Sequence, residues 1–305
     1  MHILSGKIAI VLLLCASVLA RASGNTDLPS ETLRAQFIQT QADKGFAEQD
    51  TLHFLALAKH NQTVLDAISA PWEAKPWHQY APLFLTQARL TAGISFWKTH
   101  QKAINRAAET FDVDPQIIVA IIGIETFFGR QTGKYSVLDA LYTLGFNYPP
   151  RAKYFLQELA KLQQLVKEEQ LQLTELTGSY AGAMGYGQFM PSSYLNFAVD
   201  FDKDGKRDLF ASPTDAIGSV ANYFHQHGWQ KGEPVALPLS LLTPKANTAQ
   251  VWTGEALHYT IADILSPDLA LTTAKDIDVS QKALLLQLQQ TETVEYWLGM
   301  NNFYV

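Results

Sequence analysis

The most distinctive pattern in the chain is an almost unbroken apolar run between Asp114 and Gly129. Six β-branched residues leave it little polar face: Ile117, Ile118, Val119, Ile121, Ile122 and Ile124. Asp114 followed by Pro115 is typical of a helix start, and Gly129 of a helix end. The β-branched content would also suit a buried strand, but the length and both end signals favour a helix. The pattern therefore predicts a buried helix.

One carboxylate interrupts this run, Glu125, and it is followed by Phe127 and Phe128. Burial disfavours the charged form of a carboxyl group, and the negative end of a helix dipole acts in the same direction. Both effects favour a Glu that stays protonated near neutral pH, as a general acid must. The alternative is a structural Glu that pairs with Arg89 or Arg130. These residues alone leave both interpretations open.

Helical patterns also fill most of the chain before this run. Residues 33–40 and 51–59 look amphipathic, and an irregular aromatic segment contains Trp72, Trp77 and Tyr80. These aromatic rings could stack on sugars, although such residues more often anchor loops or fill a core.

After the apolar run, the patterns predict a long helix over about 151–172 and another over 214–227. From about 232 to 288 the chain is richer in Pro, Val, Leu and Thr, which indicates a small, partly β module. We therefore expect a mainly α protein, α+β overall, in four parts: 1–22, 23–103, 104–231 and 232–305.

The first part, residues 1–22, has the features of a secretory signal. Lys7 precedes a short apolar run, and Ala20-Arg21-Ala22 is an A-x-A cleavage site. Cys15 follows Leu14 rather than the small residue of a lipoprotein signal, so we expect release into the periplasm rather than lipid anchoring. No later stretch is apolar enough to cross a membrane.

Composition excludes several classes of function. Losing Lys7 and Arg21 with the signal would take the formal net charge from −6 to −8, which argues against a nucleic-acid partner. Cys15 is the single cysteine. Without the signal, the chain has neither disulfides nor thiol chemistry.

A glycine-rich segment spans residues 178–193, with Gly182, Gly185 and Gly187 close together. Glycines at this density let the backbone approach another group closely. Their order differs from the dinucleotide fingerprint, and no βαβ pattern surrounds them, so a nucleotide site is excluded. The Gly, Ser, Tyr and Gln mixture suits a cleft for carbohydrate. A flexible interdomain loop is the alternative, but Met184 and Phe189 favour an anchored segment.

An acidic segment follows directly, with Asp200, Asp202 and Asp204 at alternate positions before Gly205. This matches the first half of an EF-hand calcium loop. Ala211 stands at the twelfth position, where an acidic residue is expected, and Asp215 could close a longer loop. We expect a structural ion, since every ligand would be committed to it.

Four segments together resemble the B-type lytic murein transglycosylases, bacterial cell-envelope enzymes with a lysozyme-like core. The similarity extends from about residue 37 to the end, and residues 178–193 are the most specific part. The matching segments are 122–129, 147–149, 178–193 and 215–224.

The resemblance implies that Glu125 is the single catalytic acid and base, acting on peptidoglycan glycan strands. It implies substrate contacts or cleft-wall positions for five residues: Tyr80, Ser179, Met184, Gln188 and Tyr223. It also implies Ca²⁺, and no organic cofactor, held by Asp200, Asp202, Asp204, the Lys206 carbonyl and Asp215. The loop is one residue longer before Asp215 than in the family, which leaves this last ligand open.

The family continues beyond the point that matches Val305, with a segment that returns to the core. A truncated chain with an incomplete cleft is therefore one interpretation of the ending. Two other functions stay open: a hydrolytic muramidase that uses the same Glu with water, and a non-catalytic peptidoglycan-binding protein. Single-carboxylate chemistry rests mainly on the resemblance, since ordinary glycosidases use two carboxylates.

Overall fold

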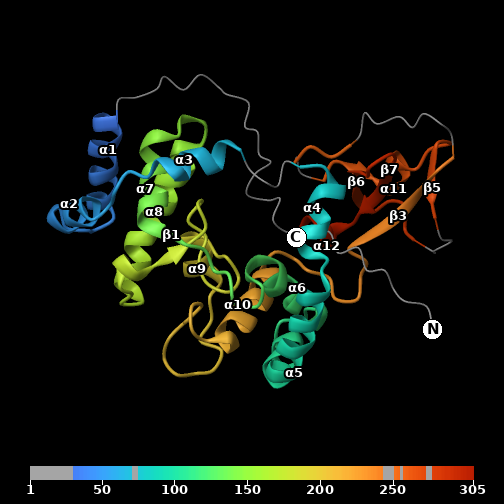
Figure 1. The fold of residues 1–305 in the computed structure, drawn as a ribbon, viewed down its shortest axis with the longest axis horizontal. Coiled ribbons are helices and arrows are strands. Elements are labelled where there is room, and N and C mark those ends of the chain that lie inside the picture. Colours follow the sequence, from blue (N-terminus) through green and yellow to red (C-terminus); the bar gives the residue numbers. More distant parts are fainter. Residues whose placement is uncertain (1–29, 71–74, 243–250, 255–256, 273–276) are drawn as a thin grey trace.

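The computed structural model describes residues 30–70, 75–242, 251–254, 257–272 and 277–305. The predicted signal (1–22) and Trp72 lie outside the described residues. Figure 1 shows a helical part, which carries most of the chain, beside a smaller sheet-containing part. This arrangement confirms the expected mainly α, mixed α+β fold.

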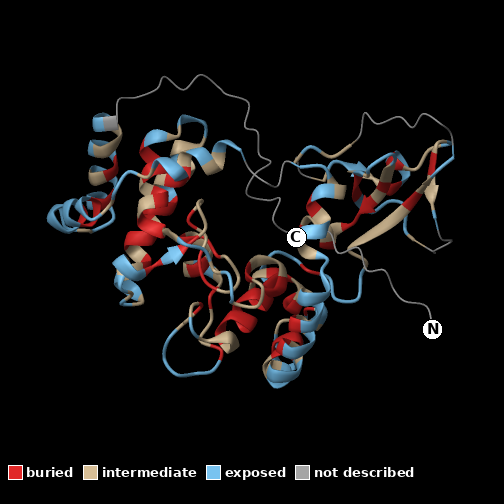
Figure 2. Ribbon diagram, viewed as in Figure 1, coloured by how far each residue is buried: buried red, intermediate tan, exposed pale blue. Residues whose placement is uncertain are grey.

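Ten α-helices precede the five-stranded sheet among the described residues, and all but the fourth, which lies beside that sheet in Figure 1, form the helical part. Their bounds are α1 Ser30–Asp43, α2 Glu48–Ala56, α3 Gln62–Ser69, α4 Trp77–Phe84, α5 Gln87–Thr110, α6 Pro115–Thr126, α7 Val137–Asn147, α8 Ala152–Glu168, α9 Pro191–Phe197 and α10 Pro213–Gln226. A two-stranded sheet joins β1 (Tyr135–Ser136) to β2 (Thr177–Gly178), with Tyr135 opposite Gly178. Helices α7 and α8 pack against each other, and their facing sides are largely buried (Figure 2).

The sheet-containing part is antiparallel, with strand order β4-β6-β7-β3-β5. Its strands are β3 Ala236–Leu241, β4 Tyr259–Thr260, β5 Leu269–Leu271, β6 Lys282–Gln289 and β7 Val294–Gly299. Short helices α11 (Ile261–Ile264) and α12 (Asn301–Tyr304) accompany it. Leu285 and Leu298 face each other across β6 and β7 in a core separate from the helical one. The predicted β module is therefore present, and its last strand extends beyond residue 288.

Helix α6 confirms the predicted buried helix. Ile118 and Ile122 are fully buried, and α5 and α10 pack against it. Its start differs in detail, because the Asp114 side chain makes no cap bond to the helix. Asp114 instead accepts from Trp229 Nε1 (3.0 Å) and from the Gly232 amide (3.1 Å). It thereby ties the start of α6 to the segment that leads into the sheet.

Candidate active site

The end of α6 differs from the prediction of a glycine stop. The helix ends at Thr126, and Phe127, Phe128 and Gly129 all have positive φ values of 50°, 61° and 80°. The Phe127 amide donates to Gly123 O, as in an αL-type helix end, and the Phe128 amide donates to Ile122 O. The left-handed conformation costs a residue with a side chain about 1–2 kcal/mol. Such strain persists only where surrounding contacts impose it.

Glu125 lies one residue before this strained end and is half-buried. The nearest acidic residues in the sequence bond elsewhere. Asp114 accepts from Trp229, as described above, and Asp139 Oδ1 accepts from the Lys59 amide at 2.7 Å. Arg89, one of the two arginines considered as a partner for Glu125, donates to the carbonyls of Gly123 and Ile124.

The glycine-rich loop, which we define as residues 179–190 between β2 and α9, packs against the end of α6. The Thr126 hydroxyl donates to Tyr186 O at 2.9 Å and accepts from the Gly129 amide at 2.9 Å. A β-carbon on Gly129 would lie 2.1 Å from the Tyr186 ring, so only glycine permits this approach. The loop is therefore anchored next to Glu125, as its apolar residues predicted.

Ser179 and Gln188 are both half-buried on this loop. Ser179 Oγ accepts from the amides of Ala181 (3.3 Å) and Ala183 (3.1 Å), and the hydroxyl keeps its own proton for donation. Gln188 Nε2 donates to Thr132 O and to Gly185 O, each at 3.1 Å. Its carbonyl Oε1 is thus the atom that Gln188 can offer to a ligand.

Three other residues were expected at a cleft wall. Met184 has no exposed surface and pairs with Phe189 across a backbone bridge, so it supports the loop from the core rather than facing a ligand. Tyr80, on α4, is only 4% exposed. Tyr223, on α10, is half-buried, and its ring lies 5.2 Å from Phe197 and stacks on His227 at 4.0 Å.

Sequence reasoning missed Glu158, which holds the far end of the glycine-rich loop. This buried carboxylate, on α8, accepts from the Ser192 amide (2.9 Å) and from the Ser192 hydroxyl (2.7 Å) at the start of α9. The available signal was its position three residues after Phe155 and four before Leu162, on the apolar face of α8.

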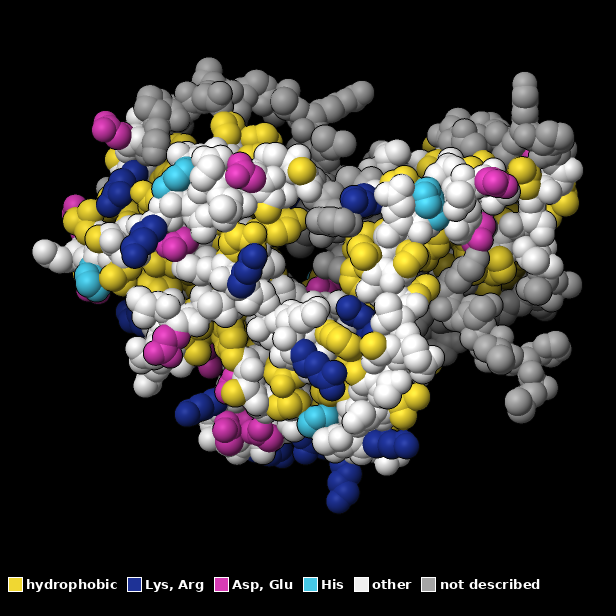
Figure 3. All heavy atoms as spheres, in the orientation of Figure 1, with side chains coloured by type: hydrophobic (Ala, Val, Ile, Leu, Met, Phe, Trp, Pro, Cys, Tyr) yellow, Lys and Arg dark blue, Asp and Glu magenta, His cyan; other side chains and the backbone are white. Residues whose placement is uncertain are grey.

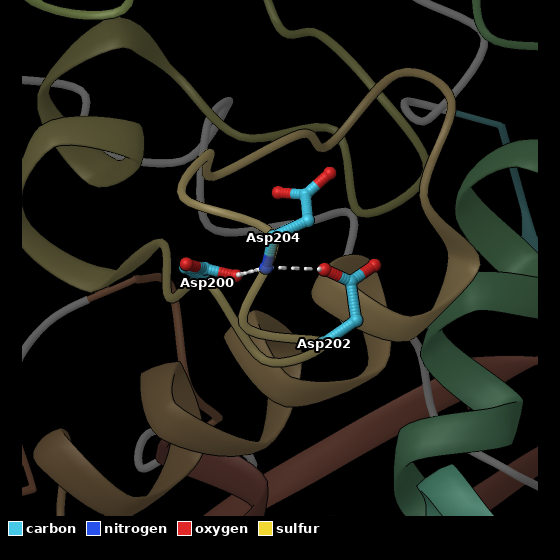
Figure 4. Close-up of side chains that lie close together, drawn as sticks. All are labelled: Asp200, Asp202 and Asp204. Atoms are coloured by element: carbon cyan, nitrogen blue, oxygen red, sulfur yellow. Dashed lines mark hydrogen bonds between the residues drawn. The ribbon is translucent and has the colours of Figure 1, made fainter.

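The acidic segment forms a compact loop in which the carboxylates of Asp200 and Asp202 lie on either side of the Asp204 amide (Figure 4). Ligand oxygens of Asp200, Asp202 and Asp204 all lie within 4.8 Å of each other. The Asp204 amide donates to Asp200 Oδ1 (3.1 Å) and to Asp202 Oδ1 (3.2 Å), and the Lys206 amide donates to Asp204 Oδ1 (2.9 Å). Oxygen ligands converging in this way suit a hard cation such as Ca²⁺.

Asp215 is placed differently from the expectation of a closing ligand. It is fully buried and is not part of the three-carboxylate group. Its Oδ1 accepts from the amides of Phe201 (2.7 Å) and Asp202 (3.1 Å), and its Oδ2 from that of Asp208 (2.9 Å). Three of the roughly four lone-pair sites of this carboxylate are therefore occupied. Burial raises the pKa of Asp215, and the hydrogen bonds from the three backbone amides oppose this increase.

The acidic loop of residues 200–215 and the glycine-rich loop are also joined. The Tyr186 amide donates to Leu209 O at 2.9 Å. On the face shown in Figure 3, basic and acidic side chains are interspersed over the helical part. Within the described residues, no helix is both long and apolar enough to span a bilayer.

Residues 30–305 match the family described as the transglycosylase SLT domain. The chain is 42% identical over 280 residues to membrane-bound lytic murein transglycosylase B of Escherichia coli (strain K12), which covers 88% of this chain and 75% of that protein.

Two crystal structures are similar to the whole fold. Soluble lytic transglycosylase SltB1 from Pseudomonas aeruginosa has a TM-score of 0.79 at 42% identity, covering 89% of this chain and 90% of that one. The Escherichia coli lytic transglycosylase Slt35 in complex with calcium has a TM-score of 0.76 at 41% identity, covering 89% and 85%.

Proposed function

This chain belongs to the transglycosylase SLT family, and we propose that Glu125 carries its reaction. The protein is an enzyme, a lytic transglycosylase that acts on peptidoglycan. The observation that supports Glu125 most strongly is its position in the last turn of the buried helix α6. At that point, Thr126 bonds to the loop that carries Ser179 and Gln188.

In the proposed reaction, protonated Glu125 donates to the oxygen of the β-1,4 bond between N-acetylmuramic acid and N-acetylglucosamine. The C1–O bond breaks, and the acetamido group of the same sugar stabilises the oxocarbenium-like centre. The Glu125 carboxylate then removes the proton from the muramic O6 hydroxyl, and O6 bonds to C1. A 1,6-anhydro ring forms, no water is consumed, and the proton is again on Glu125.

One carboxyl group suffices for this cycle, because acid and base steps follow each other on the same side chain. Two observations support a single acid. Asp114 and Asp139, the neighbouring acids in the sequence, are bonded to Trp229 and to the Lys59 amide. We assign ligand contacts to the Ser179 hydroxyl and Gln188 Oε1, and cleft-wall contacts to Tyr223.

Mass spectrometry of the soluble products tests this reaction. Purified sacculi incubated with the enzyme should release muropeptides with 1,6-anhydromuramic ends. Products with reducing muramic ends, which are heavier by one water molecule, would show that the enzyme is a hydrolytic muramidase.

We also propose a structural Ca²⁺ in the loop of residues 200–215. The ion would be held by Asp200, Asp202, Asp204 and the Lys206 carbonyl. Asp215 would hold the surrounding loop in place through the hydrogen bonds that it accepts from backbone amides. When bound, the ion supplies positive charge that offsets repulsion among the three carboxylates.

The remaining proposals concern location and organisation. We propose that the enzyme works in the periplasm after cleavage behind Ala22, in the compartment that holds its substrate. Residues 23–103, 104–231 and 232–305 would be its helical, catalytic and β-containing domains. Mass spectrometry of the N-terminus of protein from a periplasmic extract tests the cleavage site. An uncleaved or lipid-modified N-terminus would contradict it.

A further inference from the structure

The last turn of α6 needs a hydrogen-bond donor from outside the helix. In a regular helix the Phe128 amide would donate to Ile124 O. Here, it donates to Ile122 O at 3.2 Å, because Phe127 and Phe128 turn into the left-handed region. The Ile124 carbonyl, which belongs to the same peptide unit as the Glu125 amide, thus loses its regular partner. A half-buried carbonyl in this situation requires another donor.

Arg89, in the first turn of α5, supplies that donor. Its Nη1 donates to Gly123 O at 2.5 Å and to Ile124 O at 3.0 Å. A single nitrogen that contacts two successive carbonyls restrains both the position and the tilt of the last turn. The positive charge also lies at the negative end of the α6 dipole, where it is favourable.

The guanidinium of Arg89 is itself held between two aromatic rings. Its central carbon lies 5.1 Å from the ring centroid of Phe84 and 5.0 Å from that of Phe127. The Arg89 amide donates to the Thr86 side chain, which caps α5. Burial lowers the pKa of Arg89, but a guanidinium is so basic that the group stays charged at neutral pH.

Tight packing of the Phe128 ring also restrains the last turn of α6. The Phe128 ring lies between Gly93 of α5 and Gly123 of α6, where added β-carbons would be 3.0 Å and 2.6 Å from Phe128 Cζ. Helix α6 therefore has little freedom to move relative to α5.

We infer that Arg89 is a positioning residue for the catalytic step, which rests on the proposed role of Glu125. It fixes the peptide unit that leads into Glu125, so that the carboxyl group meets the glycosidic oxygen in a productive geometry. Substrate binding through the glycine-rich loop does not need Arg89. Its loss should therefore lower kcat and leave KM nearly unchanged.

The test compares kcat and KM on solubilised glycan strands for the wild-type enzyme, Arg89→Met and Arg89→Lys. All assays include calcium and are run well below each melting temperature. Arg89→Met should lower kcat about 10- to 100-fold, the scale expected for a small misplacement of a catalytic group. Arg89→Lys should recover part of this loss, because an ammonium group can still donate to one carbonyl.

Arg106→Met is the matched control. Arg106 lies on the same helix, donates to Phe201 O and stacks on the Phe201 ring at 4.0 Å, so its replacement removes equivalent contacts to a segment other than α6. This variant should lose a comparable amount of thermal stability and keep kcat within about twofold.

Wild-type kcat in Arg89→Met would overturn the inference, as would an equal loss of kcat in Arg106→Met. If Arg89→Met does not fold, an unchanged kcat in Arg89→Lys would overturn it and a reduced one would support it. If the wild-type enzyme is active and an Arg89 variant is equally active, the inference about Arg89 fails and the proposed function stands. A wild-type enzyme that releases no anhydro products would overturn the proposed function and the role of Arg89 together.

Discussion

The Thr126 hydroxyl and the Tyr186 carbonyl, 2.9 Å apart, join the residue after Glu125 to the middle of the glycine-rich loop. The Tyr186 amide donates in turn to Leu209 O, within the acidic loop of residues 200–215. One backbone position thus connects helix α6, the loop with Ser179 and Gln188, and the proposed calcium site. This connection brings the loop that carries Ser179 and Gln188, which follow Glu125 by 54 and 63 positions, against the end of the same helix.

Replacing Thr126 by Val should destabilise the fold and lower activity. The side chain is fully buried, so its removal leaves the Tyr186 carbonyl and the Gly129 amide without this partner. A buried polar group that loses its partner costs about 1–3 kcal/mol. Urea unfolding measures the change, and Thr126→Ser, which keeps the hydroxyl, is the control. Equal stability of the Val and Ser variants would contradict the role of this hydrogen bond.

Gly185→Ala should be more destabilising than Gly45→Ala. Both glycines have positive φ, at 70° and 85°. A β-carbon on Gly45 meets nothing within 4 Å, whereas one on Gly185 would lie 2.5 Å from Leu209 O. Gly45→Ala should therefore cost about 1–2 kcal/mol from conformation alone. Gly185→Ala should cost a further 1–3 kcal/mol or so, because the backbone must shift. Thermal unfolding of both variants checks the order, and similar losses would argue against a tight junction at Leu209.

Calcium should raise the melting temperature of the wild-type protein. At a concentration of 100 Kd, binding to the folded state alone contributes about 2.7 kcal/mol. For a chain of this size, we expect a rise of roughly 5 °C or more. Asp202→Ala/Asp204→Ala should abolish the response to calcium. Asp43→Ala/Asp66→Ala, which removes two exposed carboxylates that each accept from a glutamine four residues earlier, should keep it. A wild-type melting temperature that does not respond to calcium would count against the site.

Sequence patterns predicted the elements better than their ends. The position and burial of α6 were predicted correctly, because the length of the apolar run and Pro115 are local signals. The predicted end of α6 was wrong: Gly129 was expected to stop the helix, but the helix ends at Thr126. Tertiary contacts determine where the helix ends. Phe128 packs between two glycines, and Arg89 donates to the carbonyls of Gly123 and Ile124. No local rule predicts two successive phenylalanines in a left-handed conformation.

The candidate site was predictable where residue type alone identifies the chemistry. Alternating aspartates before Gly205 indicated a cation site, and the structure brings three of them together. The positions of Asp215 and Met184 were not predictable in this way. The Asp215 carboxylate accepts hydrogen bonds from three amides of its own loop. Met184 is buried and forms a backbone bridge with Phe189. Arg89, Thr126 and Glu158 act through backbone groups of distant segments, which a single sequence does not reveal.

The most direct test of the central claim is the release of anhydromuropeptides from purified sacculi by Glu125→Gln. Glutamine keeps the size of the side chain but can neither donate the acidic proton nor recover it. We predict that the variant binds sacculi, melts close to the wild-type temperature and releases no measurable 1,6-anhydro product while the wild-type enzyme does. Substantial anhydro product from a correctly folded Glu125→Gln protein would contradict the assignment of Glu125 as the catalytic acid and base.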